Sequence, residues 1–269
     1  MVNIVAALRF EKALQLMDSD LSWKTQGQED NIEKYLDIAL GFSINNVCSS
    51  YWVSPKGLIL ENFGSIQGGY SGDYGTEALE EMSQLTEFAE ENLQSDRAKK
   101  YIERMKNAYS AIDNFMFTAN AEIDGNPTLY AEGLTGNRNA YYPGTERYIL
   151  DEYNAVEKGN KTALKTYELF FEHNKLLVNA ESYTPSNSHF EDNALAVIKM
   201  YINFDKIISK INEENIIDYD YIMDDDSQTS YAWADEMGRN VVIKNGDERI
   251  YLALNWRNPL HSQTYYNTA

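Results

Sequence analysis

Arg-Asn-Val-Val-Ile-Lys-Asn-Gly-Asp-Glu-Arg-Ile-Tyr-Leu-Ala-Leu-Asn-Trp occupies residues 239–256 and marks a change from helical to β-structure near residue 227. Residues 239–244 and 248–256 alternate in the manner of strands. Asn245-Gly246 between them predicts a hairpin, because both turn residues must accept positive φ. One or two hairpins do not form a self-sufficient sheet. We therefore expect this β part either to pack on the helices before it or to open a domain of a longer chain.

Upstream of this hairpin, apolar side chains recur at helical spacing. The pattern predicts helices at residues 2–17, 31–50, 76–92, 95–120, 145–158, 161–179 and 189–212, with Asp30, Thr76 and Ser95 as caps. Antiparallel helical pairs with long loops at one end suit an α/α toroid, and a plain bundle is the alternative. We predict a mainly α fold, with an α/α toroid-like helical-hairpin domain over 1–217 and the start of an antiparallel, sandwich-type β domain over 218–269.

The net charge of the chain excludes some classes of binding partner. The 42 acidic and 23 basic side chains give a formal net charge of −19. Such a chain repels nucleic-acid phosphates and anionic membrane surfaces. A polyanionic substrate would require a local basic patch. No apolar run is long enough for a membrane span, and the single cysteine, Cys48, is expected to be a buried thiol.

A glycine-rich segment carries the strongest chemical signal. Gly68-Gly-Tyr-Ser-Gly-Asp-Tyr-Gly-Thr76 runs directly into a predicted helix. Glycines allow the backbone to turn sharply and approach a ligand. Tyr70 and Tyr74 precede the helix N-terminus, whose partial positive charge favours an anion or a tyrosinate. The structural alternative is a tight turn with two packed aromatic rings.

The run Tyr70-Ser-Gly-Asp-Tyr-Gly75, followed by an amphipathic helix, resembles a segment of the toroidal glycosaminoglycan and xanthan lyases, the hyaluronate and chondroitin AC lyase family. The resemblance implies an α/α toroid before β-sandwich domains and a catalytic acid/base at Tyr74. The stretch Lys56–Asn62 is similar to the family's stretch before its histidine, whose place falls at Asn62 or Ser65. The loop Gly136-Asn-Arg-Asn139 is similar in place to the family's arginine loop.

β-Elimination from a uronic acid requires donors that neutralise the carboxylate, a base for the C5 proton and an acid for the leaving oxygen. Tyr74 is the candidate for both proton transfers. The other catalytic candidates are Asn62, Arg138 and His189. The substrate-binding candidates are carboxylate ligands and stacking aromatics: Asn137, Asn139, Tyr70, Tyr141, Tyr142, Trp52 and Trp23.

Two other functions remain open. One is a toroidal glycoside hydrolase with Asp73 as its acid, and the other is a non-catalytic glycan-binding or scaffold module. Asp224-Asp-Asp226 is a candidate for weak Ca²⁺ binding, although a solvated acidic turn is the favoured explanation because the run lacks the spacing and the glycine of an EF-hand. We expect a polysaccharide or oligosaccharide partner and an extracytoplasmic location, with the targeting signal outside this sequence.

Overall fold

The structure is a computed structural model that describes residues 2–17, 36–37, 40, 42, 53–59, 72–123, 126–133, 153–179, 202–236 and 240–253. Helices account for about 55% and strands for 21% of these residues, so the fold is mixed rather than mainly α. The helical elements are α1 (Val2–Met17), α3 (Gly72–Asn92), α4 (Ser95–Asp113), η2 (Tyr153–Glu157, a π-helix), α5 (Lys161–Asn179), α8 (Phe204–Glu213) and η3 (Ile216–Asp218). The strands are β1 (Met116–Ile123), β2 (Asn126–Gly133), β3 (Ser230–Asp235), β4 (Asn240–Asn245) and β5 (Glu248–Ala253).

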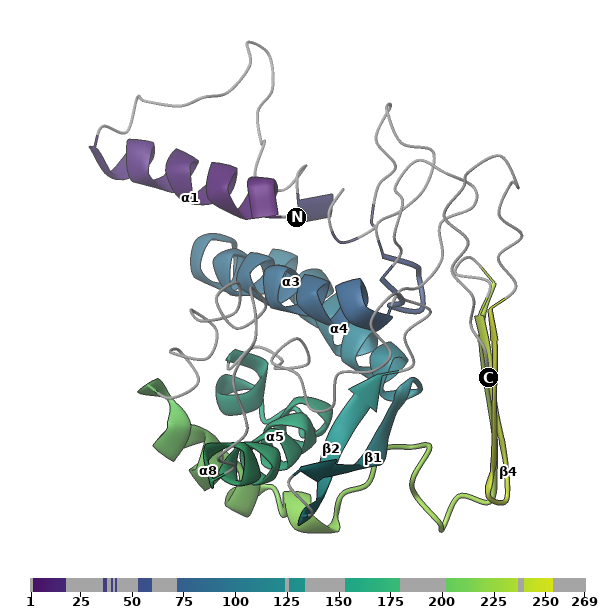
Figure 1. The fold of residues 1–269 in the computed structure, drawn as a ribbon. Coiled ribbons are helices and arrows are strands. Elements are labelled where there is room, and N and C mark those ends of the chain that lie inside the picture. Colours follow the sequence, from purple (N-terminus) through teal and green to yellow (C-terminus); the bar gives the residue numbers. More distant parts are fainter. Residues whose placement is uncertain are drawn as a thin grey trace, which may run out of the picture.

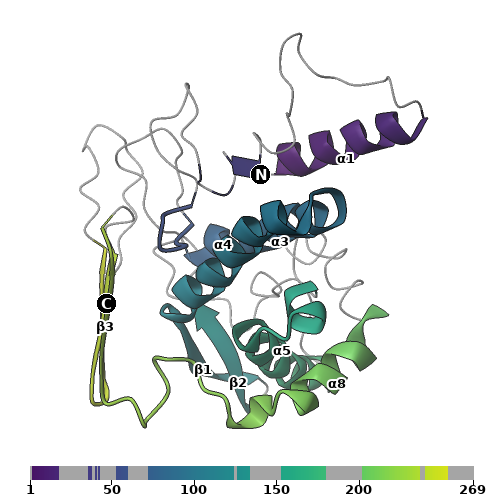
Figure 2. The same ribbon diagram turned by 180° about the vertical axis from the view of Figure 1, so that it is seen from behind.

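The helical pair α3–α4 is the centre of the fold (Figure 1). In both views α1 lies on one side of this pair, and α5 and α8 lie on the other (Figure 2). Apolar side chains at helical spacing on α3 and α4 meet those of α5 and α8, and each large one contributes about 1.5–3 kcal/mol on burial. Among the members of this core are Leu79, Met82, Leu85, Tyr101, Met105, Tyr109, Leu164, Tyr167 and Ile207.

The structure corrects the prediction of a helix through residue 120. Helix α4 ends at Asp113, because the Asn114 side-chain amide donates to the carbonyls of Ser110 and Ala111 at 2.8 and 3.1 Å. The chain then enters β1, which pairs with β2 in an antiparallel register from Met116↔Gly133 to Ile123↔Asn126. The hairpin packs on α5 through Met116 of β1, Ala131 of β2, and Leu169. Residues 126–133, which lie between the predicted helices at 95–120 and 145–158, are therefore a strand.

The bounds of α1 and α5 are confirmed. Helix α3 begins at Gly72, four residues before the predicted start. The cap position of α4 is Gln94 and not Ser95, and no side-chain cap bond forms there. The remaining predicted helices are described only in part. The described residues are 36, 37, 40 and 42 of 31–50, 153–158 of 145–158, and 202–212 of 189–212. Residues 153–157 are π-helical, and α8 begins at Phe204.

The predicted hairpin of residues 239–256 is confirmed, and β3 adds a strand to it in the order β3-β4-β5. Its two turn residues are Gly246 and Asp247 rather than Asn245 and Gly246, because Asn245 still pairs with Glu248 and does not have positive φ. Gly246 has φ 59°, the left-handed conformation that the turn requires. The sheet packs on the C-terminal end of α4 through Phe115 and Val242, and the Phe115 ring meets Trp233 edge-on at 5.8 Å. The β part therefore packs on the helices, which is one of its two expected outcomes.

No α/α toroid is shown by the helices that the structure describes, which stack in layers (Figure 1). Within the same residues, no helix is long and apolar enough to cross a lipid bilayer.

A short loop, residues 53–59, joins the sheet to the helices. Val53 and Ile59 form an isolated antiparallel bridge, and Gly57 at φ 92° touches the backbone of α4. Arg104 of α4 donates to the Ser54 carbonyl at 2.6 Å. The loop is thus closed by the bridge between Val53 and Ile59, and α4 holds it through Arg104.

Candidate functional site

Of the residues proposed from the sequence as a site, the structure describes the backbone of Tyr74 and Asp73. Both lie in the first turn of α3. The others fall outside the described residues: Asn62, Arg138, His189, Tyr70, Asn137, Asn139, Tyr141, Tyr142, Trp52 and Trp23. Tyr74 was expected just before the helix, and it lies within it. The partial positive charge of the helix N-terminus acts at this first turn.

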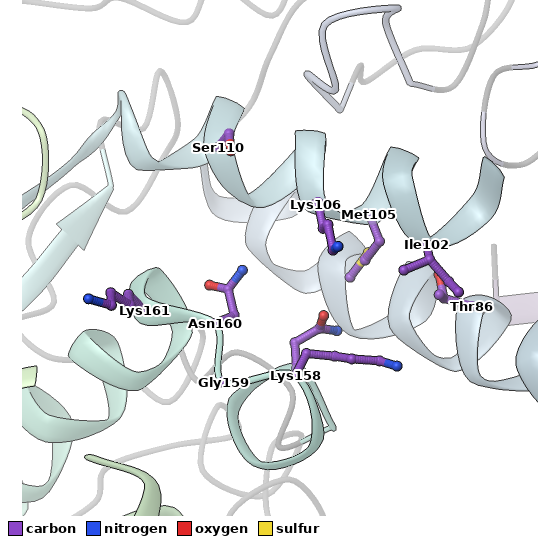
Figure 3. A pocket seen from close by; sticks show the side chains of 10 residues that line it. Thr86, Ile102, Met105, Lys106, Ser110, Lys158, Gly159, Asn160 and Lys161 are labelled. Atoms are coloured by element: carbon purple, nitrogen blue, oxygen red, sulfur yellow. The ribbon is translucent and has the colours of Figure 1, made fainter. Parts of the chain in front are cut away.

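A pocket of about 310 Å³ lies between α3, α4 and the turn from η2 into α5 (Figure 3). Its volume is at the lower end of the range for small-molecule sites. Met105, Ile102 and Thr86 supply apolar atoms. The other lining residues are polar or cationic, or form the turn itself: Lys106, Ser110, Asn154, Lys158, Gly159, Asn160 and Lys161.

The turn that closes the pocket is held by local bonds. Gly159 has φ 58°, and a Cβ there would lie 3.0 Å from Glu214 Oε1. The Asn160 N–H donates to the Asn154 carbonyl at 2.9 Å, and Asn160 Oδ1 accepts from the Ala163 N–H at 3.1 Å. Asn160 therefore caps α5 with its oxygen, in the usual manner of an Asn N-cap. Its amide nitrogen is not needed for the cap.

The three lysines of the pocket differ in their partners. Lys158 Nζ lies 2.5 Å from Glu90 Oε1 and 5.2 Å from the Tyr153 ring centre. Lys161 Nζ lies 5.9 Å from the Tyr219 ring centre. Lys106 makes no ion pair or hydrogen bond with any residue that the structure describes. Within the described residues, Lys106 thus gives this pocket an unpaired cation in a chain of net charge −19, whereas the charge of Lys158 is balanced by Glu90.

A partly buried polar junction lies at Asp113, the last residue of α4. Asp113 Oδ1 accepts from Thr162 Oγ1 of α5 and from the Tyr219 hydroxyl, each at 3.3 Å. Burial raises the pKa of Asp113 to about 6, against the effect of these donors. Burial and the Asp113 charge raise the pKa of Tyr219 to about 12. Thr162 follows Lys161, so a carboxyl that titrates near neutrality lies beside the lysine-lined pocket.

The acidic turn at 224–226 ties strands together. Asp224 Oδ2 accepts from the Thr118 N–H of β1 at 2.6 Å, and its Oδ1 lies 3.3 Å from Arg249 Nη2 of β5. Asp225 Oδ1 accepts from the Ser227 N–H at 2.8 Å. No group of three or more acidic, histidine or cysteine side chains in the described part of the chain could hold a metal ion. The structure therefore gives the Ca²⁺ prediction no support.

Gly159 and Asn160 lie between the predicted helices at 145–158 and 161–179, and the pocket was not predicted from the sequence. The sequence gives only a weak indication of the pocket. Lys158 and Lys161 flank residues 159–160, but Lys106 lies about 50 residues upstream. The packing of α4 against the start of α5 is what brings them together. Comparisons with protein-family models, curated proteins and solved structures found no match to this chain.

Proposed function

We propose that this chain cleaves a uronic-acid-containing glycan by β-elimination, with Tyr74 as the acid/base. The observation that carries the proposal is the position of Tyr74 in the first turn of α3, directly after a glycine-rich segment. The helix N-terminus favours the tyrosinate that must remove the C5 proton. The resemblance to the toroidal lyases supplies the reaction class, and the α/α toroid and β-sandwich belong to the same proposal.

The negative charge of the proposed substrate matches a lysine-lined pocket among the described residues. A uronate polymer is an anion, and the chain as a whole repels anions. The lysine-lined pocket between α4 and η2–α5 gives such a polymer a place of opposite charge. The remaining proposed roles are unchanged: Asn137, Arg138 and Asn139 would bind the uronate carboxylate, and the tyrosines at 141 and 142 would stack on sugar rings. The proposed location is extracytoplasmic, where such polymers occur.

The experiment is an assay of the whole chain on hyaluronate, chondroitin and xanthan, followed by ultraviolet absorbance. A lyase leaves an unsaturated uronate that absorbs, and a hydrolase leaves reducing ends without absorbance. Tyr74→Phe should reduce turnover by roughly 10²- to 10⁴-fold, the usual contribution of a general acid or base. Full activity in Tyr74→Phe would overturn the assignment.

Tyr251→Phe is the matched control. Its hydroxyl is buried in the sheet packed on α4, and it has no hydrogen-bond partner within the part of the chain that the structure describes. The control should keep wild-type turnover. Reducing ends without absorbance would favour the hydrolase with Asp73, and the absence of both products on all three polymers would favour the binding module.

A further inference from the structure

The pocket between α4 and the η2–α5 turn combines a cation, amide donors and an apolar floor. The cation is Lys106, whose side chain is exposed and has no partner among the described residues. Figure 3 shows the Lys106 and Asn160 side chains reaching into the space between the helix and the turn from opposite sides. Lys158 and Lys161 extend toward opposite ends of this space.

The donors in this pocket are not matched by acceptors. Asn160 uses its oxygen for the α5 cap, which leaves its NH₂ group facing the space. Ser110 adds an exposed hydroxyl one helical turn from Lys106. A surface that presents an unpaired cation and an unused N–H donor group favours a ligand with negatively charged oxygens. Met105 and Ile102 provide the apolar contact that the C–H face of a sugar ring requires.

We propose that this pocket is a binding subsite for a single carboxylated sugar, with Lys106 and the Asn160 NH₂ group holding the carboxylate. The choice of a uronate as ligand rests on the proposed function, whereas the preference for an anion rests on the pocket alone. The volume of about 310 Å³ suits one sugar ring and not a longer chain.

The subsite is separate from the proposed catalytic position. Thr86 lines the pocket, and Tyr74 precedes it by 12 residues on α3. At 1.5 Å per residue, the two positions are about 18 Å apart along the helix. A polymer bound at both positions would use the pocket as a remote anchor. Binding by a remote anchor lowers KM when it is equal in the ground state and the transition state.

The test is a titration of the whole chain with four probes, followed through the amide and side-chain NMR signals of the pocket. The probes are glucuronate, glucose, acetate and inorganic phosphate. Glucuronate should shift the Asn160 side-chain signals and bind at least about tenfold more tightly than glucose, since a charge-assisted pair is lost without the carboxylate. Acetate should bind more weakly than glucuronate, because it has no ring to contact Met105.

Two substitutions locate the binding. Lys106→Met keeps the length of the side chain and should weaken glucuronate binding roughly tenfold. Asn160→Asp keeps the oxygen that caps α5 but replaces the NH₂ donor with negative charge, so it should weaken binding at least as much without loss of fold. Lys99→Met is the control, because Lys99 lies on the same helix, is exposed and pairs with Asp96. This control should leave binding unchanged, and thermal unfolding checks that all three variants fold.

The outcomes separate the two proposals. Glucuronate binding that depends on Lys106 supports the subsite even if no polymer is cleaved, in which case only the lyase proposal fails. Polymer cleavage without glucuronate binding overturns the subsite and leaves the lyase proposal standing. Equal binding of glucose and glucuronate, binding of phosphate alone, or unchanged binding in Lys106→Met each overturns the subsite.

Discussion

Ser54 and Asp235 lie 181 positions apart in the chain and share a buried hydrogen bond, in which Ser54 Oγ donates to Asp235 Oδ2. Both residues are almost fully buried. Ser54 Oγ also accepts from the Leu58 N–H at 2.9 Å, so one hydroxyl holds the 53–59 loop in shape and joins it to the end of β3. Lys56 reinforces this connection through the Ala234 carbonyl. The sheet is thus joined to the helical part by hydrogen bonds as well as by apolar packing.

The first prediction concerns this hydroxyl. Ser54→Ala removes a buried donor and acceptor at once, and we expect a loss of about 1–3 kcal/mol in the free energy of unfolding. Urea unfolding measures it. Ser95→Ala is the control, because Ser95 is exposed at the start of α4 and forms no side-chain cap; it should change stability by less than about 0.5 kcal/mol. An equal effect of the two substitutions would contradict the role of Ser54.

The second prediction compares two glycines with positive φ. At Gly57, with φ 92°, a Cβ would lie 2.4 Å from the Asn107 carbonyl carbon, and backbone cannot move aside as a side chain can. At Gly246, with φ 59°, a Cβ would meet nothing within 4 Å. Gly246→Ala therefore carries only the conformational cost of about 1 kcal/mol, while Gly57→Ala adds a clash and should lose more than twice as much. Thermal unfolding of both variants would show the difference, and similar losses would contradict the close approach of the 53–59 loop to α4.

The parts of the fold that sequence predicted well are those in which one local signal is sufficient. Helices α1 and α5 begin and end where helical spacing begins and ends. Asn245-Gly246 located its hairpin, although the turn residues are Gly246 and Asp247 and of these two only Gly246 has positive φ. The β1–β2 hairpin was missed although Asp124-Gly125 separates its strands, since the apolar spacing of α4 continues past Asp113 into Phe115 and Met116. What ends α4 is a side-chain bond from Asn114, which periodicity does not reveal.

The same distinction between local and long-range signals applies to the candidate site. Tyr74 could be proposed from the sequence because it belongs to a contiguous segment with an unusual composition. The pocket was not found, because Lys106 and Asn160 come from distant parts of the chain and meet only through the packing of α4 on α5. The overall composition does not indicate the pocket either, because a net charge of −19 gives no sign that three lysines lie close together.

The third prediction contrasts two tyrosines that pack at the interface between the sheet and α4. The Tyr251 hydroxyl is buried and has no hydrogen-bond partner in the described residues, whereas the Tyr231 hydroxyl donates to Asn114 Oδ1 at 2.6 Å. Tyr251→Phe removes an unsatisfied group and should be neutral or stabilise the fold by up to about 1 kcal/mol. Tyr231→Phe leaves the buried Asn114 oxygen without this donor and should cost about 1–3 kcal/mol. Urea unfolding of the pair provides the comparison, and a larger loss in Tyr251→Phe would contradict it.

The fourth prediction follows from Asp113, which joins the C-terminal end of α4 to Thr162 and Tyr219. Its pKa is raised from 3.8 to about 6, chiefly by burial, with the charge of Asp224 adding to the shift. A carboxyl whose pKa is higher in the folded state binds a proton more tightly when folded. Its ionisation therefore destabilises the fold: the penalty is absent below pH 3.8, grows between pH 3.8 and 6, and is complete above pH 6.

Asp113→Asn should remove this penalty while its Oδ1 continues to accept from Thr162 and Tyr219. Relative to wild type, the variant should gain about 2–3 kcal/mol in the free energy of unfolding at pH 8 and almost nothing at pH 4. Urea unfolding of both proteins at each pH gives this difference, in which the contributions of the other titrating groups cancel. Asp96→Asn, at an exposed position on the same helix, should show a small difference at both values. An Asp113→Asn effect that is constant between pH 4 and pH 8 would show that this carboxyl keeps its ordinary pKa in the folded protein.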